Sequence, residues 1–305
     1  MEEMTAYLAS DGYVDELVYD LGGAGSGVTV RDRLVVVPGP PPPVARSAAW
    51  AANIWLDPRW IPIDSIGHGA AQLRDLQRNW SLYSCGSHRR AALIQAKLPY
   101  VSAKPHRFGD PAPSAPLGSW TLWEDNLILA SPACTSPFPH GEVHFVENKI
   151  DPPNRAYLKL WELFTLLEIT PKPGELCLDL GSSPGGWSWV LHQLGANVLS
   201  VDKAELDPSV ARLPRIEHRL GSGFGLDPRT AGKVDWLFSD MACYPERLYK
   251  LIQRWLDLGQ CERFVCTLKL QGDTDHATIQ KFAAIPGSRL LHLSCNKHEL
   301  TWVKV

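Results

Sequence analysis

Residues 175–187 read ELCLDLGSSPGGW, and the pattern of this stretch decides the fold class. Its first half, Leu176–Leu178, is an apolar run of the kind found in strands that are buried on both faces of a parallel sheet. The run ends at Asp179. The glycines of the turn that follows are Gly181, Gly185 and Gly186. Residues 188–194 then have helical spacing, and a strand, a glycine turn and a helix in this order predict a ligand site beyond the carboxyl end of the strand.

The rest of the C-terminal half alternates between helices and strands, beginning with a predicted helix over residues 154–167. The predicted strands are 175–179, 198–202, 234–240 and 263–270, and the helices between them are 186–194 and 245–257. Two last strands, 289–295 and 299–305, are separated by hairpin spacing. This order predicts an α/β fold with a Rossmann-like, mostly parallel sheet, to which the closing hairpin adds one antiparallel strand.

An acidic residue also ends the second strand, because Asp202 follows the apolar run Val198–Val201. A carboxylate at this position can accept hydrogen bonds from both hydroxyls of a ribose. A dinucleotide-dependent oxidoreductase would share the glycine turn and this acid. Its turn reads GxGxxG, however, whereas GSSPGG stands here, and it leaves the closing hairpin unexplained.

Residues 1–149 differ in pattern and predict a smaller α+β region, so we place a domain boundary between residues 149 and 150. The elements expected there are a helix at 14–21, strands within 28–37 and 48–63, and a strand pair over 120–130. Proline-rich segments at 38–43 and 110–119 are expected to be linkers, since proline ends helices and ladders. The glycine-rich turn at 22–27 lacks the Gly-Lys-Ser/Thr of a P-loop and is predicted to be a flexible connection.

The 305 residues carry a formal net charge of −3, so overall charge does not indicate nucleic-acid binding. Seven cysteines without a CxxC pair indicate reduced core thiols, and the acidic N-terminus does not resemble a signal peptide. No apolar run approaches the roughly 20 residues of a membrane helix, and we expect a cytoplasmic protein. The sequence HGEVH at 140–144 has its glutamate out of register with the HExxH zinc pattern, so no metal site is expected.

One segment, residues 76–109, contains basic side chains but neither Asp nor Glu. Its basic residues are Arg78, Arg89, Arg90, Lys97, Lys104 and Arg107. Aromatic residues such as Tyr100 are interleaved with them, and residues 87–98 predict a helix with a basic face. A local basic patch is the electrostatic footprint of an RNA-contacting surface. A solvated helix face beside core aromatics explains the segment equally well.

Four charged residues stand where an unpaired charge is energetically unfavourable. They are Lys159, Asp240, Lys269 and Glu299. Lys159 lies in the apolar helix, Asp240 ends a strand, and Glu299 begins the last strand. Lys269 stands between two leucines of an otherwise apolar strand, where a charged side chain is unusual. A structural ion pair explains any one of them, but three fall at the same strand ends as Asp179 and Asp202.

The phrases that carry a family resemblance are PNRAYLKLWE at 153–162, DLGSSPGGW at 179–187, SVD at 200–202, SDMA at 239–242 and HELTWV at 298–303. Together with the order Lys–Asp–Lys–Glu, they resemble the FtsJ-like family of RNA 2'-O-ribose methyltransferases. The resemblance covers about residues 152–305 and is strongest to members that modify large-subunit ribosomal RNA. It implies S-adenosyl-L-methionine as cofactor, RNA as substrate and no metal. Such members carry N-terminal ferredoxin-like and THUMP modules that bind RNA, of which residues 1–149 are expected to be a shortened, divergent version.

The resemblance also implies roles for individual residues. The cofactor-binding residues are expected to be Asp179, Gly181, Ser183, Pro184, Gly185, Gly186, Trp187, Asp202, Ser222 and Asp240. Ser222 stands where the family usually has an acidic residue near the adenine, and Asp227 lies out of register with that position. The catalytic residues are expected to be Lys159, Asp240, Lys269 and Glu299. Lys269 is assigned as the general base, because burial and a neighbouring ammonium favour the neutral form of an amine.

Two further functions remain open on this pattern. An mRNA cap 2'-O-methyltransferase uses the same tetrad, although the longer phrases quoted above favour the ribosomal RNA enzymes. A non-catalytic RNA-binding or ribosome-assembly factor could keep the fold, but then any member of the tetrad could be lost without consequence, and all four are present.

Overall fold

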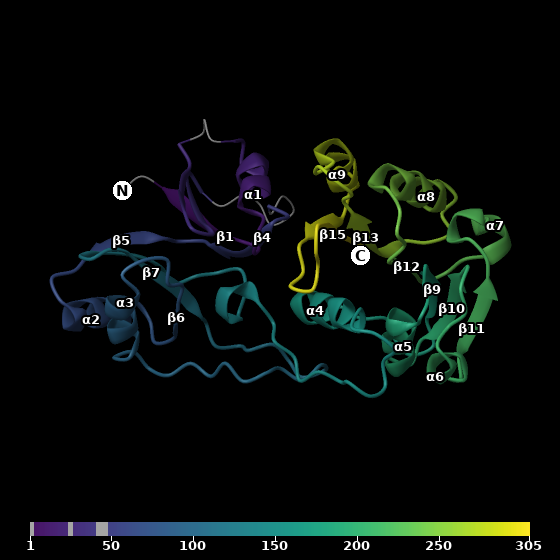
Figure 1. Ribbon diagram of the computed structural model, residues 1–305, viewed down its shortest axis with the longest axis horizontal. Coiled ribbons are helices and arrows are strands. Elements are labelled where there is room, and N and C mark those ends of the chain that lie inside the picture. The colour runs from purple at the N-terminus through teal and green to yellow at the C-terminus, as the bar shows by residue number, and fades with distance from the viewer. Residues whose placement is uncertain (1–2, 24–26, 41–47) are drawn as a thin grey trace. The chain divides into compact units, whose positions relative to one another are not determined.

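The computed structural model describes residues 3–23, 27–40 and 48–305, shown as a ribbon in Figure 1. The chain divides into two compact units. The first consists of Met1–Pro43 with Trp50–Phe145, and the second of Val146–Val305 with Val44–Ala49. The predicted turn at 22–27 and the predicted spacer at 38–43 each include residues that lie outside the described ranges.

The second unit is built on one seven-stranded sheet in the order β11-β10-β9-β12-β13-β15-β14. The strands are β9 Leu176–Leu180, β10 Asn197–Asp202, β11 Ile216–Leu220, β12 Trp236–Ser239, β13 Arg263–Lys269, β14 Ser288–Leu291 and β15 Glu299–Lys304. The pairs from β11 to β13 are parallel, whereas β15 pairs antiparallel with both β13 and β14. The predicted Rossmann-like sheet with one antiparallel strand is therefore confirmed.

Helices cover both faces of this sheet, with α4 and α5 on one face and α8 and α9 on the other (Figure 1). The helices are α4 Tyr157–Leu167, α5 Gly186–Gln193, α6 Pro208–Ala211, α7 Pro228–Ala231, α8 Pro245–Asp257 and α9 His276–Ala283. In α8 the predicted stripe is buried, and its members are Leu248, Leu251, Ile252 and Trp255. The periodic pattern thus located α4, α5 and α8, because each buries an apolar face.

The closing hairpin differs from the prediction. The strand expected over 289–295 ends at Leu291, so residues 292–298 form a longer connection to β15. The backbone N–H of His292 donates to Ala49, and Ser294 hydrogen-bonds to Glu162 of α4. These contacts draw the chain away from the ladder, although its apolar sequence favours a strand.

The first unit contains two four-stranded sheets, ordered β2-β3-β1-β4 and β5-β8-β7-β6. The strands are β1 Met4–Ala9, β2 Thr29–Arg31, β3 Leu34–Pro38, β4 Ala51–Trp55, β5 Arg59–Pro62, β6 Trp80–Leu82, β7 Gly118–Glu124 and β8 Leu127–Ser131. The helices are α1 Val14–Asp20, α2 Ile66–Leu76 and α3 His88–Gln95. The expected helix near 14–21, the strand pair at 120–130 and the helix within 87–98 are confirmed.

The two helices α2 and α3 pack on each other and on the second sheet. Trp80, Trp120 and Ile94 are fully buried in the core between them. Among the helices in the described parts of the chain, none is long and apolar enough to cross a membrane.

Candidate active site

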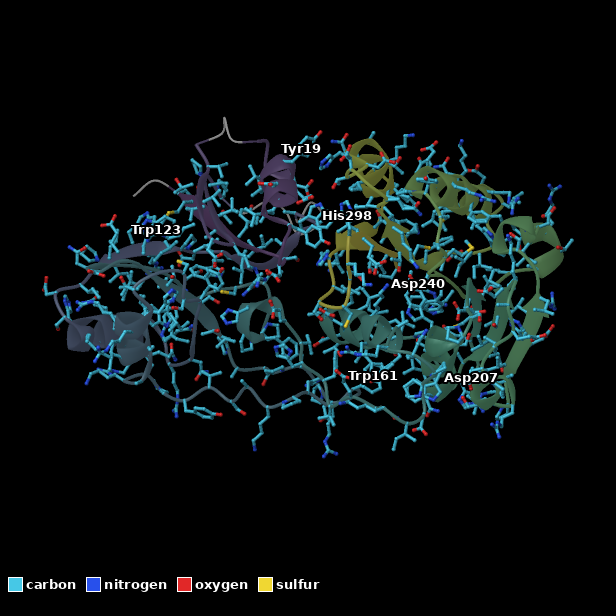
Figure 2. All side chains as sticks on the ribbon, in the orientation of Figure 1. Tyr19, Trp123, Trp161, Asp207, Asp240 and His298 are labelled. Carbon is cyan, nitrogen blue, oxygen red and sulfur yellow. The ribbon has the colours of Figure 1, made fainter. Side chains whose placement is uncertain are left out.

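Lys159 lies within α4, whose sides differ in chemistry. Trp161 packs against Tyr157 and against Trp189 of α5, and it lies on the other side of α4 from Asp240 (Figure 2). The ammonium of Lys159 points toward the ends of the strands. Its Nζ lies 2.5 Å from Oε1 of Glu299 and 3.4 Å from Oδ1 of Asp240. The apolar side of the helix therefore anchors a lysine whose charge meets two carboxylates.

The register of the sheet brings the other three residues together. Asp240 follows β12, Lys269 ends β13, and β12 and β13 run parallel, so both residues lie at the same edge. Because β15 is reversed, its first residue, Glu299, pairs directly with Lys269. The Nζ of Lys269 donates to the backbone oxygen of Asp240 at 2.7 Å and lies 3.1 Å from its Oδ1. The strand order thus explains why residues so far apart in sequence meet.

The four side chains form a row of alternating charge, Glu299–Lys159–Asp240–Lys269, in which Asp240 is shared by both lysines. Two cations and two anions cancel, which offsets the desolvation that an isolated buried charge would suffer. The side chain of Lys269 is 26% exposed, against 10% for Lys159, so Lys269 is the amine that a ligand can approach. The geometry brings together all four residues that the sequence singled out.

The glycine turn is shaped by close packing. Gly181 has φ +76° and Gly185 has φ +115°, a region that side chains rarely adopt. A Cβ added at Gly181 would lie 2.5 Å from Cγ of Met241, and one at Gly186 would lie 2.1 Å from Oδ1 of Asn154. The glycines therefore let the turn fit against the loop after β12 and the segment before α4.

Asp202 ends β10 and organises the turn from the neighbouring strand. Its two carboxylate oxygens accept hydrogen bonds from the backbone N–H groups of Ser183 at 3.1 Å and Ala204 at 2.9 Å. The hydroxyl of Ser183 donates to Glu205, and the carbonyl of Pro184 accepts from Asp207. A carboxylate has about four acceptor positions, so Asp202 retains capacity for ligand hydroxyls.

Asp179 is the most deeply buried acid of this edge, at 1% exposure. Burial raises the pKa of Asp179 to about 7, and the nearby carboxylates of Asp240 and Asp202 add to this rise. The hydroxyl of Ser188 donates to Asp179 at 2.6 Å and opposes the shift. A cationic ligand nearby would favour the ionised form of this buried carboxyl group.

Two of the expected cofactor residues, Trp187 and Ser222, also have structural positions in the fold. Trp187 is 3% exposed, and its indole N–H donates to the carbonyl of Ala156, which joins α5 to the start of α4. Ser222 is half-buried and begins the short 3-10 turn Gly223–Gly225 after β11. Asp227 caps α7 by accepting from the N–H of Arg229, in keeping with its placement out of register.

The basic residues of 76–109 lie in the first unit, with Arg78 before β6 and the others on or after α3. Arg78, Arg89, Lys97, Lys104 and Arg107 are exposed. Arg90 is half-buried, and its Nε donates to the carbonyl of Asp125 in the β7–β8 turn. The carboxylate of Asp125 also accepts a hydrogen bond from Ser87 at the start of α3. The fold therefore brings an acid beside a segment whose own sequence contains none.

A groove of about 600 Å³ adjoins the same segment. It is lined by β6, by α3 and by residues 98–103, and Tyr100 in its wall is 86% exposed. Lys97 and Lys104 flank this stretch in sequence and are both exposed. The interleaved aromatics noted in the sequence hinted at such a feature, but only the structure shows that Tyr100 is exposed.

One buried acid near the tetrad went unnoticed in the sequence. Glu162 is 3% exposed and lies one helical turn after Lys159 in α4. Its position in the sequence, a charged residue among the apolar Leu160, Trp161 and Leu163, could have indicated that it is buried. Within the described ranges, no group of three or more His, Cys, Asp or Glu side chains could hold a metal ion.

The site therefore lies at the carboxyl edge of a Rossmann-like sheet, where the row of four charges adjoins the glycine turn. Residues 152–271, which are less than half of the chain, match the model of the FtsJ-like methyltransferase family.

More particular similarity is to curated proteins named ribosomal RNA large subunit methyltransferase M. The protein from Halorhodospira halophila is 37% identical over 121 residues, which are 39% of this chain and 35% of the relative. The protein from Aromatoleum aromaticum is 34% identical over 176 residues, 56% of this chain and 46% of the relative. The chain thus spans less than half the length of either relative. Among solved structures, the fibrillarin pre-rRNA processing protein of Methanococcus jannaschii is 16% identical with a TM-score of 0.36, and the match covers 45% of this chain and 69% of that one.

Proposed function

We propose that this protein transfers a methyl group from S-adenosylmethionine to a ribose 2'-hydroxyl of RNA, with large-subunit ribosomal RNA as the substrate. One observation carries the proposal: two lysines share the carboxylate of Asp240 at the sheet edge that also holds the glycine turn. The FtsJ-like match and the named relatives support the same reaction.

The residues at the edge fit the cofactor. Asp202 offers acceptor positions for ribose hydroxyls at the end of β10. Within the described ranges Asp179 and Asp202 form no ion pair, and burial already raises the pKa of Asp179, so a ligand with positive charge is favoured there. When bound, S-adenosylmethionine supplies the sulfonium methyl and the positive charges of its sulfonium and amino groups. Ser183–Gly186 would hold it beside Asp202, and Ser222 would face its adenine.

The tetrad would prepare the ribose hydroxyl. The bound cofactor would supply its methyl group to the 2'-oxygen, and the electron pair of the methyl–sulfur bond would stay on the sulfur of S-adenosylhomocysteine. The hydroxyl proton passes to the neutral amine of Lys269, the more exposed of the two lysines. Lys159 would remain held between Glu299 and Asp240, and Asp240 would orient both amines. Alignment of oxygen, methyl and sulfur supplies much of the acceleration.

The first unit would hold the RNA chain through Lys97, Lys104 and the groove beside Tyr100. An exposed aromatic side chain offers a stacking surface to an unpaired base, and basic side chains on either side attract the phosphates. Arg89, Arg78 and Arg107 would add to this attraction, whereas Arg90 has a structural partner in Asp125.

Because all cysteines of the chain are free thiols, we place the protein in the cytoplasm.

Mapping of 2'-O-methyl groups tests the proposal. Ribosomal RNA from cells with and without the gene is compared by mass spectrometry and by primer extension at low nucleotide concentration. We expect one 2'-O-methyl position of the large-subunit RNA to disappear with the gene and to return with a plasmid copy. Loss of a cap methyl group instead would favour the cap enzyme. An unchanged RNA, together with defective ribosome assembly, would favour the non-catalytic factor.

A further inference from the structure

Glu162 is a buried acid that the proposed chemistry does not use. Both of its carboxylate oxygens accept from the backbone N–H of Ser294, at 2.9 and 3.0 Å, and Oε2 also accepts from the Ser294 hydroxyl at 2.6 Å. A carboxylate at 3% exposure needs such partners, because burial without them is strongly unfavourable. The hydrogen bonds reach from α4 to the connection between β14 and β15.

This connection is the segment that delivers Glu299 to the tetrad. Lys159 and Glu162 are three residues apart in α4, so they lie on the same side of the helix. Lys159 contacts Glu299, and Glu162 contacts Ser294, five residues earlier in the chain. Residues 292–298 lie outside the β14–β15 ladder, so the ladder does not fix them. Two successive turns of α4 thus contact the chain at two nearby points, Ser294 and Glu299.

We propose that Glu162 is a positioning residue: it clamps Ser294 to α4 so that Glu299 meets Lys159 in the geometry that methyl transfer needs. This inference rests on the proposed function for its kinetic consequence, but not for its structural one. Misplacement of a catalytic group by about 1 Å can lower a rate by roughly a hundredfold, so a clamp outside the reacting atoms can control turnover.

Cys295 provides a reporter that is independent of methyl transfer. This free thiol is half-buried next to Ser294 in the clamped segment. Burial and then the Glu162 carboxylate raise the pKa of the Cys295 thiol, while a hydrogen bond from Ser294 and the charges of Arg155 and Lys159 lower it. Loss of the clamp should therefore expose the thiol, loss of the Glu162 charge should also ease its ionisation, and both changes speed its alkylation.

The experiment compares Glu162→Gln, Ser294→Ala and the double variant with the full-length wild-type protein. For Glu162→Gln we expect kcat to fall roughly ten- to a hundredfold, with the KM for RNA and the affinity for S-adenosylmethionine within about twofold of wild type. For Ser294→Ala, which keeps the backbone N–H, we expect roughly a two- to fivefold fall. The double variant should be no worse than Glu162→Gln, because both changes break one interaction.

Alkylation of Cys295 by iodoacetamide, followed by peptide mass spectrometry with Cys85 as internal reference, should be clearly faster in Glu162→Gln. The increase should be smaller in Ser294→Ala, because that variant also loses the hydrogen bond that lowers the pKa of the thiol. Ser288→Ala is the matched control, since the buried Ser288 hydroxyl bonds to Phe282 and Ile285 and does not touch the clamp. That variant should lose thermal stability but keep wild-type kcat and Cys295 reactivity.

Wild-type kcat and wild-type Cys295 reactivity in a folded Glu162→Gln protein would overturn the proposal and leave Glu162 a purely structural residue. If Glu162→Gln does not fold, Ser294→Ala decides alone, and unchanged kcat in it overturns the clamp. If even the wild type methylates no RNA, the proposed function fails, whereas faster Cys295 alkylation in the two variants would still establish the clamp.

Discussion

The two lysines of the site differ in what surrounds them. Lys159 lies between two carboxylates, at 2.5 Å from Glu299 and 3.4 Å from Asp240, whereas Lys269 contacts only Asp240 and is more exposed. Lys159 is therefore enclosed by carboxylates, whereas Lys269 is the amine that a substrate hydroxyl can reach.

Substitution of Lys269 tests this division of roles. Lys269→Met keeps length and apolar character, so we expect the fold and cofactor affinity to persist while methyl transfer falls by roughly two to four orders of magnitude. Lys269→Arg should be nearly as inactive, because arginine does not lose its proton near neutral pH. Single-turnover rates measure both. Lys304→Met, at the far end of β15, is the control and should retain activity. Substantial activity in Lys269→Arg would exclude Lys269 as the base.

Asp202 should contribute directly to cofactor affinity. We expect Asp202→Ala to weaken S-adenosylmethionine binding by roughly 1–3 kcal/mol, since a charged acceptor for hydroxyls is lost. Isothermal calorimetry measures the change. Asp227→Ala is the control, because Asp227 caps α7 and should leave the affinity unchanged. Equal affinity in wild type and Asp202→Ala would remove Asp202 from the binding site.

The raised pKa of Asp179 predicts a pH-dependent effect on stability. The folded protein holds this proton up to a pKa of about 7, whereas the unfolded chain releases it near 3.8, so the contribution of Asp179 to stability falls as pH rises between these values. Asn does not titrate. Asp179→Asn should therefore gain stability relative to wild type between pH 5 and pH 8, by up to about 3 kcal/mol. Thermal unfolding of both proteins at the two pH values measures it. A stability difference that is the same at pH 5 and pH 8 would contradict the buried, raised-pKa state.

At the level of helices and strands, the sequence predicted the elements that bury a continuous apolar run or an apolar helix face. The buried runs located β9, β10, β12 and β13, and the amphipathic stripe located α8. The edge strand β11, IEHRL, went unpredicted because most of its side chains are exposed, so it has no apolar run. The four-residue helices α6 and α7 are too short for a helical period and begin with capped Asp-Pro pairs.

The tetrad was predictable because each member is a charge in an apolar setting. The contacts that arrange it were not, since Glu162 and Ser294 are 132 residues apart and meet only through the fold. The same holds for α3, where Asp125 joins the basic segment from the β7–β8 turn. Sequence windows report local charge, whereas a surface is assembled from distant segments.

The segment after α3 carries the prediction for RNA binding. We expect Lys97→Glu with Lys104→Glu to weaken binding of single-stranded RNA and to lower the slope of log affinity against log salt by roughly 0.7 per lost phosphate contact. Filter binding over a salt series measures this. The control with equal net charge is Lys172→Glu with Lys233→Glu, which are exposed and precede β9 and β12 at the opposite edge of the sheet from the tetrad. Equal slopes for the two double variants would assign residues 97–104 to an ordinary solvated surface.

Across the whole chain, the part that matches the family model is shorter than the part that builds the candidate site. The FtsJ-like match covers 152–271, yet Glu299 and Ser294 lie beyond it and complete the site in the structure. The first unit has its own sheets and core, and the proposal that it is a divergent THUMP-like module rests on the sequence resemblance alone.

The reaction itself can be tested with the purified full-length chain. Large-subunit ribosomal RNA from cells lacking the gene is incubated with the protein and S-adenosylmethionine labelled in its methyl group, and the RNA is then hydrolysed in alkali. Alkaline cleavage requires a free 2'-hydroxyl, so a 2'-O-methyl group leaves its label in an alkali-resistant dinucleotide. We predict label in such dinucleotides with wild type and almost none with Lys269→Met. Label in mononucleotides would show base methylation, and no transfer to any RNA supplied would show that the chain is not the methyltransferase proposed here.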